Sequence, residues 1–488
     1  MSLLVSSWPL IRPRSTSIVV AVQALSLALL ATALAVAVAR DHAAAVPVAL
    51  VGLGLGWGLV RLLYRHSAWR FLVPLFLAAF AVRIAAAVAV DPLLVSTYKD
   101  VQYVGFLFED DRAYDKIAWA VTRIWAGALP GIARSDEYLL NNYTYTMAGL
   151  YTLVGHELLA AKFVNCFLGA MVSILAFSLG KEIAGVGAGR FAALASAFFP
   201  SMILWSVLNL KDMPVVLLIV ACMAGTLRFA RAPGLGVAAA TLVAFVCLEN
   251  LRLYAFFALG WLMPVTFFVA NRAAWRRRLA VGVPFGLAVL SLVYMTNQSQ
   301  WLGLRYLTPK RTEALDYSRG FGSGVAESGI ELERIPRTEG GWQIQLVNAP
   351  KVLPYVLFAP FPWAARRPRE LALIPELLAW YAVLTLAVVG LVGCRRERWR
   401  EMFMLVSYGG GMVLIFSLIE GNVGTIFRHR AMLMPPTFAL AGLGLVWLRA
   451  WWTGRQTKPR FRASGAGLRG VIPTGSTELG ARKSTPVI

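Results

Sequence analysis

The stretch IVVAVQALSLALLATALAVAVA, residues 18–39, decides the fold class, because it carries no charged residue and is long enough to cross a bilayer. Apolar runs of similar length recur along most of the chain, which is 58% hydrophobic and only 15% charged. A soluble domain has about 25% charged residues, so this chain has too few charges to cover a water-facing surface. A cleaved signal peptide has a shorter apolar core, so we expect this first run to be retained as a helix. The sequence therefore predicts an all-α membrane protein that crosses the bilayer many times.

The apolar runs predict about twelve transmembrane helices, each near the length that spans the hydrocarbon layer. The expected spans are residues 18–39, 43–63, 71–90, 160–183, 191–208, 214–229, 234–248, 254–270, 279–296, 371–393, 402–419 and 431–448. Two of these, 234–248 and 254–270, are short and could instead form one hairpin that dips into the membrane. We find no internal repeat in the sequence.

Basic residues in the short loops predict the direction in which the helices run. If the N-terminus is cytoplasmic, every short loop assigned to that side is basic, as loops on the cytoplasmic side tend to be. These loops contain Arg61, Arg65, Arg70, Lys181, Arg190, Arg228, Arg231, Arg272, Arg276, Arg277, Arg278 and the 395–400 cluster. Both termini are therefore expected on the cytoplasmic side of the inner or plasma membrane of a cell. Two long segments, residues 91–159 and 297–370, are expected outside, where long loops often carry function.

The net charge of +22 does not by itself indicate nucleic-acid binding. The positive residues lie mainly between apolar runs and in the tail, and the sequence has no basic groove interleaved with aromatic residues. The four cysteines lie in or beside apolar runs and form no CxxC or Cys/His cluster; they are Cys166, Cys222, Cys247 and Cys394. The sequence therefore predicts no nucleic-acid partner, no disulfide framework and no zinc site.

The segment FEDDRAYDKIAW, residues 108–119, carries the first candidate site. From Tyr114 onward its apolar residues recur at helical spacing, which predicts an amphipathic helix lying along the outer membrane surface. Asp111 lies one turn before Tyr114 on the same stripe, and an acid that loses contact with water becomes a better proton acceptor. In the alternative interpretation, Asp110 and Asp111 only cap the positive end of the helix.

Two short outside turns add further charged side chains. In LNLKDMP, residues 208–214, Lys211 and Asp212 are candidates if they face the first acidic loop. The alternative is that Asp212 only begins the next helix. In ENLR, residues 249–252, Arg252 is a weaker candidate, because this turn could hold only a local ion pair.

The last outside turn, EGNVGTIFRHR at residues 420–430, ends in the basic run Arg428, His429 and Arg430. Such a run offers donors that suit a phosphate at the bilayer edge, and anchoring to lipid headgroups is the alternative. Arg83 lies inside the third expected span, about 7 residues from its outer end, or roughly 10 Å at helical rise. It could reach outward or pair with an acid of the first loop, and a charge inside a membrane suggests a function.

Together these segments resemble the GT-C membrane glycosyltransferases, most closely the family 39-type group of protein O-mannosyltransferases and aminoarabinose transferases. The resemblance rests on the acidic pair followed three residues later by Tyr114, on residues 150–165, and on the Lys211-Asp212-Met213-Pro214 turn. It covers residues 71–270 well and the rest of the chain only as architecture. Two helices precede the usual first core helix, and the C-terminal soluble domain of some relatives is missing, so the identity of the acceptor cannot be transferred.

The resemblance implies that a first-loop acid acts as base on the acceptor, and that the donor is a sugar on a polyprenyl phosphate. Asp110 matches the first position of the acidic pair and Asp111 the second, but the usual Asp-Glu pair is Asp-Asp here and follows Glu109. Which carboxylate is catalytic therefore stays open, while Asp212 matches the second-loop acid. The substrate-binding candidates are Glu109, Tyr114, Arg83, Lys211, Asp212, Arg252, Arg428, His429 and Arg430, with Arg428 and Arg430 as phosphate holders. A divalent metal, Mg²⁺ or Mn²⁺, would be able to bridge the acids and the phosphate, but nothing in the sequence requires one.

The expected organisation is two additional N-terminal helices (1–70), a GT-C-like catalytic core (71–296), an extracytoplasmic loop (297–370), C-terminal helices (371–450) and a basic tail (451–488). The tail is polar and is expected to be disordered. The resemblance implies transfer of a sugar from a polyprenyl-phosphate donor to a glycan, lipid or protein acceptor in the cell envelope. The absence of a Rossmann-like fingerprint disfavours a nucleotide-sugar donor. Two alternatives remain: a glycan ligase or polymerase that uses an undecaprenyl-diphosphate-linked chain, and a 12-helix transporter or flippase.

Overall fold

The computed structural model describes residues 16–64, 68–99, 109–133, 137, 139–297, 342–364, 371–420 and 423–453. Within these ranges every regular element is a helix and no strand occurs, so the all-α prediction is confirmed. Residues 1–448 form one compact unit and residues 449–488 a second, of which only residues 449–453 are described. Most of the expected outside loop and tail lies outside the described residues, so the expectations for those two segments stay predictions.

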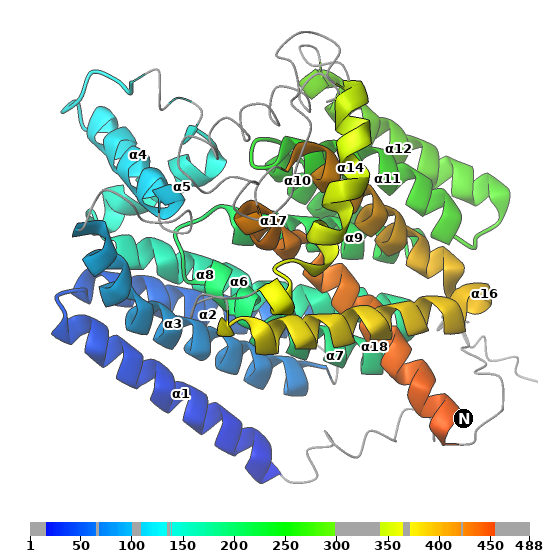
Figure 1. Cartoon of the computed structure of the whole chain (residues 1–488), viewed down its shortest axis with the longest axis horizontal. Coiled ribbons are helices and arrows are strands. Elements are labelled where there is room, and N and C mark those ends of the chain that lie inside the picture. The colour runs from blue at the N-terminus through cyan, green and yellow to red at the C-terminus, as the bar shows by residue number, and fades with distance from the viewer. Residues whose placement is uncertain are drawn as a thin grey trace, which may run out of the picture. The chain divides into compact units, whose positions relative to one another are not determined.

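The helices are named α1 to α18 along the chain (Figure 1). Their bounds are α1 Thr16–Ala39, η1 Ala43–Ala45, α2 Val46–Leu63, α3 Trp69–Lys99, α4 Glu109–Trp125, α5 Asn142–Val154, α6 Leu158–Ala184, α7 Val186–Phe198, α8 Pro200–Ser206, α9 Asp212–Arg231, α10 Leu235–Glu249, α11 Leu253–Ala270, α12 Trp275–Asn297, α14 Trp342–Phe358, η4 Pro362–Ala364, α16 Ile374–Ile419, α17 Val423–His429, η5 Arg430–Met432 and α18 Met434–Trp452.

In the described part of the chain, nine helical segments are long and apolar enough to cross a membrane, or eleven if each of two bent helix pairs is one span. Nine of the expected spans correspond to these single segments. Two others, 191–208 and 431–448, correspond to the bent pairs α7 with α8 and α17–η5 with α18. The twelfth, 234–248, is the 15-residue helix α10, which is shorter than the hydrocarbon layer of a bilayer requires.

The bend between α7 and α8 follows from a proline. Phe199 is in an extended conformation (φ −67°, ψ 128°), and Pro200 begins α8. A residue before proline avoids the helical conformation, whereas proline itself is well suited to the first helical position. The helix therefore stops at Phe198 and resumes in a direction that differs by 56°.

Helix α16 differs from the expectation of two helices joined by a basic loop. It is one helix of 46 residues that contains both expected spans, and Figure 1 shows its yellow and golden halves running in different directions. The intervening residues 395–400, RRERWR, are good helix formers without glycine or proline. Nothing in them ends the helix, so the two spanning segments Ile374–Cys394 and Arg396–Ile419 follow each other without a loop.

Helix α6 is central to the packing, since it contacts α2, α3, α7, α8 and α9. Its contact with α7 depends on glycine. A Cβ added to Gly180 would lie 2.8 Å from the carbonyl oxygen of Ala188, and one added to Gly189 would lie 2.7 Å from that of Phe177. Small residues allow such close approach of two backbones and are typical of helix pairs in membranes.

The first acidic segment forms the amphipathic helix α4, as expected, and α4 packs against α5. Its apolar stripe does not face lipid at Tyr114, Ile117, Ala118 or Val121, which are at most 5% exposed and belong to the main hydrophobic core. Packing this stripe against protein removes its apolar surface from water and fixes the start of α4 in one place.

Candidate functional site

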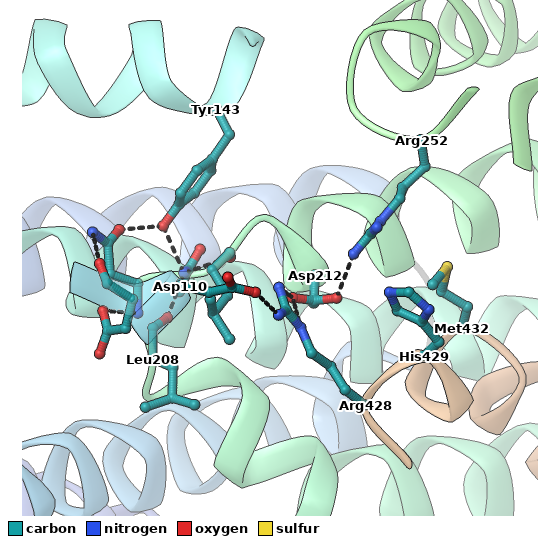
Figure 2. Close-up of polar contacts among 12 residues, drawn as sticks. Asp110, Tyr143, Leu208, Asp212, Arg252, Arg428, His429 and Met432 are labelled. Atoms are coloured by element: carbon teal, nitrogen blue, oxygen red, sulfur yellow. Dashed lines mark hydrogen bonds and ion pairs between the residues drawn. The ribbon is translucent and has the colours of Figure 1, made fainter. Parts of the chain in front are cut away.

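Four segments that are far apart in the sequence meet in one ion-pair cluster, which comprises Asp110, Asp212, Arg252 and Arg428 (Figure 2). Nη1 of Arg428 contacts the carboxylate of Asp110. Nε and Nη2 of the same guanidinium lie 2.8 Å and 2.7 Å from Oδ2 of Asp212. The other oxygen of Asp212, Oδ1, accepts a hydrogen bond of 3.1 Å from Nη2 of Arg252. The early acid and the late arginine that the sequence singled out are therefore in direct contact.

The helix ends place these side chains. Asp212 is the first residue of α9, where the positive end of the helix favours a negative charge. Arg252 directly precedes α11, and Arg428 lies in the last turn of α17. Asp110 lies in the first turn of α4, so each segment presents its charged group at a helix terminus.

The side chains of the ion-pair cluster differ in how far they are buried. The side chain of Asp212 is 1% exposed, and those of Arg428 and Arg252 are 12% and 13% exposed. The side chain of Asp110 is 48% exposed. Of the two carboxylates in the cluster, Asp110 is therefore the one that a ligand can reach from solvent, while Asp212 holds the two guanidinium groups in position.

Asp111 lies elsewhere and is completely buried. Its Oδ1 accepts a hydrogen bond of 2.9 Å from the backbone N–H of Asn209, in the turn before α9. The side chain of Asn209 accepts a hydrogen bond from the hydroxyl of Tyr143, which in turn accepts one from Asn165. This chain of contacts joins α4, α5 and α6 to the turn. The carboxylate of Asp111 therefore points into the protein rather than toward the membrane.

The polar group around Asp111 includes two residues that the sequence analysis did not select. Asn165 is the sixth residue of the expected span 160–183, and its amide also donates to the carbonyl oxygens of Leu208 and Leu210 at 2.7 Å and 2.9 Å. An asparagine inside an apolar run is a signal for such a partner, because a polar group in a membrane must find a hydrogen bond. Tyr143 follows the helix-capping Asn141 and carries no comparable signal in the sequence.

Lys211 and Tyr114 lie beside the ion-pair cluster. Nζ of Lys211 is 5.9 Å from the ring centroid of Tyr114, within the range of a cation–π contact. Burial, together with the nearby guanidinium groups of Arg252 and Arg428, lowers the pKa of Lys211 to about 7. Burial raises the pKa of Tyr114, so its hydroxyl stays protonated at neutral pH. Lys211 is therefore a cation whose charge responds to what binds next to it.

His429 and Arg430 make their direct contacts outside the ion-pair cluster, although His429 lies close enough to Asp212 and Arg252 to interact with them electrostatically (Figure 2). The ring of His429 pairs with the carboxylate of Glu420 and stacks on Phe416, with a centroid distance of 5.6 Å. Arg430 is 1% exposed and donates to the carbonyl oxygens of Val356 and Ala359, which ties η5 to α14. The structure thus brings only Arg428 of the basic run to the two aspartates.

Arg83 neither reaches outward nor pairs with an acid among the described residues. Its guanidinium is fully buried and donates to the carbonyl oxygens of Ala197 and Ser196 at 2.7 Å and 3.0 Å. These carbonyls belong to the last turn of α7, where no further helical N–H is available to them because the helix stops before Pro200. Arg83 therefore stabilises the break between α7 and α8. Glu109 begins α4, and its side chain lies outside the described part of the structure.

The cluster does not offer an evident metal site. Among the described residues, no group of three or more His, Cys, Asp or Glu side chains is arranged to hold a metal ion. The position between Asp110 and Asp212 is taken by the guanidinium of Arg428. The residues of the cluster therefore do not fit Mg²⁺ or Mn²⁺ between the two carboxylates.

The cluster combines an accessible carboxylate with cations that a buried carboxylate holds in place. Such a site can accept a proton at Asp110 and can bind an anion at Arg428, Arg252 and Lys211. No protein-family model matches the chain, and no curated protein matches its sequence.

Proposed function

We propose that the chain is a glycosyltransferase that moves a sugar from a polyprenyl-phosphate donor to an acceptor at the extracytoplasmic face of a membrane. The observation that carries the proposal is the contact of Arg428 with both Asp110 and Asp212. It joins a candidate base and a candidate phosphate-binding cation in one place, as the transfer requires.

The position of the cluster suits a lipid-linked donor. Asp212 and Arg252 stand at the beginnings of α9 and α11, two helices that are long and apolar enough to cross a membrane. A charged group at the end of a spanning helix lies near the membrane–water boundary. A polyprenyl phosphate keeps its tail in hydrocarbon and its phosphate at this same depth.

In the proposed reaction, Asp110 takes the proton of an acceptor O–H or N–H group. The acceptor atom forms a bond to the anomeric carbon, and the bond from that carbon to the phosphate oxygen breaks with its electron pair leaving on the phosphate. Arg428 and Arg252 stabilise the charge that develops there, and Lys211 adds a third cation when it is protonated. Asp212 acts as a positioning residue, because it holds both guanidinium groups.

The ion pair of Arg428 with Asp110 would couple donor binding to activation of the base. A donor phosphate competes with this carboxylate for the same guanidinium, since both are anions that prefer a charged donor. Binding of the donor would therefore release Asp110 to accept a proton only when the phosphate is in place.

Sugar transfer in proteoliposomes with a radiolabelled polyprenyl-phosphate sugar tests the proposal. We expect Asp110→Asn to reduce kcat by about 10²-fold or more, the usual contribution of a general base. Asp115→Asn is the matched control, because Asp115 lies on the same helix and instead accepts hydrogen bonds from Tyr151 and His156. Full activity in the double variant Asp110→Asn, Asp111→Asn would refute the role of the acidic pair.

A second candidate is a glycan ligase or polymerase that uses a diphosphate-linked chain. The observation that favours it is the presence of two guanidinium groups on one carboxylate, with Lys211 beside them. It predicts that Arg428→Ala abolishes transfer from an undecaprenyl-diphosphate donor while Asp110→Asn, Asp111→Asn retains it. Flux through sealed vesicles without a covalent product would instead indicate a transporter.

A further inference from the structure

A second charged site lies between the connection from α11 to α12 and the middle of α16. It is a cavity of about 350 Å³, which we call the basic pocket; its lining residues are Asn271, Arg272, Ala273, Arg278, Arg396, Glu397, Trp399 and Arg400. It shares no residue with the ion-pair cluster, and nothing in the proposed function uses it.

The basic pocket and the ion-pair cluster stand at opposite ends of the same helices. Arg252 precedes α11 and Asn271 directly follows it, so the 18 residues of α11 separate them by about 27 Å. Similarly, α9 begins at Asp212 and ends at Arg231, next to the ion pairs that border the pocket. The basic pocket therefore lies at the membrane edge opposite the ion-pair cluster.

The lining carries an excess of positive charge, with four arginines and one glutamate. The neighbouring acid Glu401 pairs with one of these four, Arg272, at 3.0 Å and with Arg231 at 3.7 Å. The other three lining arginines therefore face a single lining acid, Glu397. Neither Arg396 nor Arg400 forms an ion pair within the ranges that the structure covers. Arg400 lies over the ring of Trp399, at 5.4 Å from the centroid, which holds its guanidinium beside the cavity.

The surroundings favour a lipid as the source of the anion. The segments Ile374–Cys394 and Arg396–Ile419 meet at the pocket, so its arginines lie where two spanning segments end. Trp275 and Trp399 are 66% and 49% exposed at the same edge. Exposed tryptophans mark the headgroup region of a bilayer, and basic pockets between helices at that depth bind acidic headgroups.

We propose that the basic pocket binds the phosphate group of an anionic phospholipid. The guanidinium groups of Arg396 and Arg400 donate to the phosphate oxygens, Arg278 contributes from the α12 side, and the acyl chains lie along the apolar surfaces of α12 and α16. This proposal is independent of the proposed function, since the two sites share no residue.

Native mass spectrometry of the purified full chain in a neutral detergent tests the proposal. We expect dioleoylphosphatidylglycerol to bind more tightly than dioleoylphosphatidylcholine, and Arg396→Gln, Arg400→Gln to weaken phosphatidylglycerol binding by roughly tenfold or more. The matched control is Arg276→Gln, Arg277→Gln, which removes two exposed arginines at the same edge that do not line the pocket. This control should change the affinity by less than about twofold, and Arg396→Lys, Arg400→Lys should retain most of the binding.

Equal binding of the two lipids by the wild-type chain would overturn the proposal, and this comparison needs no variant to fold. An equal loss in both double Gln variants would also overturn it, because it would show only general attraction to the basic edge. A third arm offers inorganic phosphate alone. Saturable binding of inorganic phosphate without any preference for phosphatidylglycerol would assign the pocket to a soluble phosphate and overturn the assignment to a lipid.

Discussion

Replacing Asp212 by asparagine should strongly destabilise the protein, because it removes the charge that holds two arginines together. The side chain is 1% exposed, and its two oxygens accept hydrogen bonds from Arg252 and from two nitrogens of Arg428. Asparagine keeps the shape but leaves two guanidinium groups without their shared counter-charge in a buried position. Removing one partner of a buried ion pair costs about 3–5 kcal/mol. We therefore expect Asp212→Asn to lower the free energy of unfolding by about that amount.

Asp110→Asn provides the matched control, because Asp110 pairs with the same arginine but is 48% exposed. An exposed ion pair contributes only about 0–1 kcal/mol, so this variant should unfold almost like the wild type. Unfolding by SDS in mixed micelles measures both changes. A double-mutant cycle with Arg428→Met should show that Asp212→Asn costs less when the arginine is already gone. Equal effects of the two Asp→Asn changes, or strict additivity in the cycle, would refute the assignment of Asp212 as the buried centre of the cluster.

Three further predictions concern residues around the two aspartates and the helix packing. The pKa of Lys211 is about 7, and an adjacent phosphate favours the charged amine. Phosphate binding should therefore take up a proton and weaken by up to about tenfold per pH unit above 7. Calorimetry in buffers of different ionisation enthalpy should detect this proton uptake, and Lys211→Met should abolish it. Tyr143→Phe removes the hydroxyl between Asn209 and Asn165 and should lower the free energy of unfolding by about 1–3 kcal/mol. Hydrogen exchange in the turn before α9 should become faster, and unchanged exchange there would contradict the role of this hydroxyl in holding the turn. Gly180→Ala places a Cβ 2.8 Å from a backbone oxygen of α7 and should lower the free energy of unfolding in SDS by about 1–3 kcal/mol. Gly54→Ala is the control: its added Cβ meets nothing within 4 Å, so it should not destabilise the protein.

The helices could be predicted from the sequence because spanning length and apolar character are properties of a local segment. The run at residues 254–270, for example, is the helix Leu253–Ala270. One expected loop was wrong: residues 395–400 are basic but continue α16. The break at Pro200 was not predicted, although the residue before a proline carries a local signal for it.

The site could be predicted only as a set of segments, since contacts between them depend on packing. Asp110 and Asp111 are neighbours in the sequence, but a helix turns about 100° per residue, so only one of them can share the buried face with Tyr114. The same geometry separates Arg428 from Arg430, which are two residues apart in a helical stretch and thus point in nearly opposite directions. Treating residues 420–430 as a turn hid this difference.

The two charged sites together define a depth in the membrane. The rise of α11 between them is about 27 Å, close to the roughly 30 Å thickness of a bilayer's hydrocarbon layer. A lipid phosphate held by the basic pocket would therefore fix one end of α11 at one headgroup layer. The ion-pair cluster at the other end would then lie at the opposite headgroup layer, where the phosphate of the proposed polyprenyl donor would lie. Because α9 and α11 are packed against each other, Asp212 and Arg252 would be held at this same depth. On this reasoning, a lipid on one face would set the position of the site on the other face without touching it.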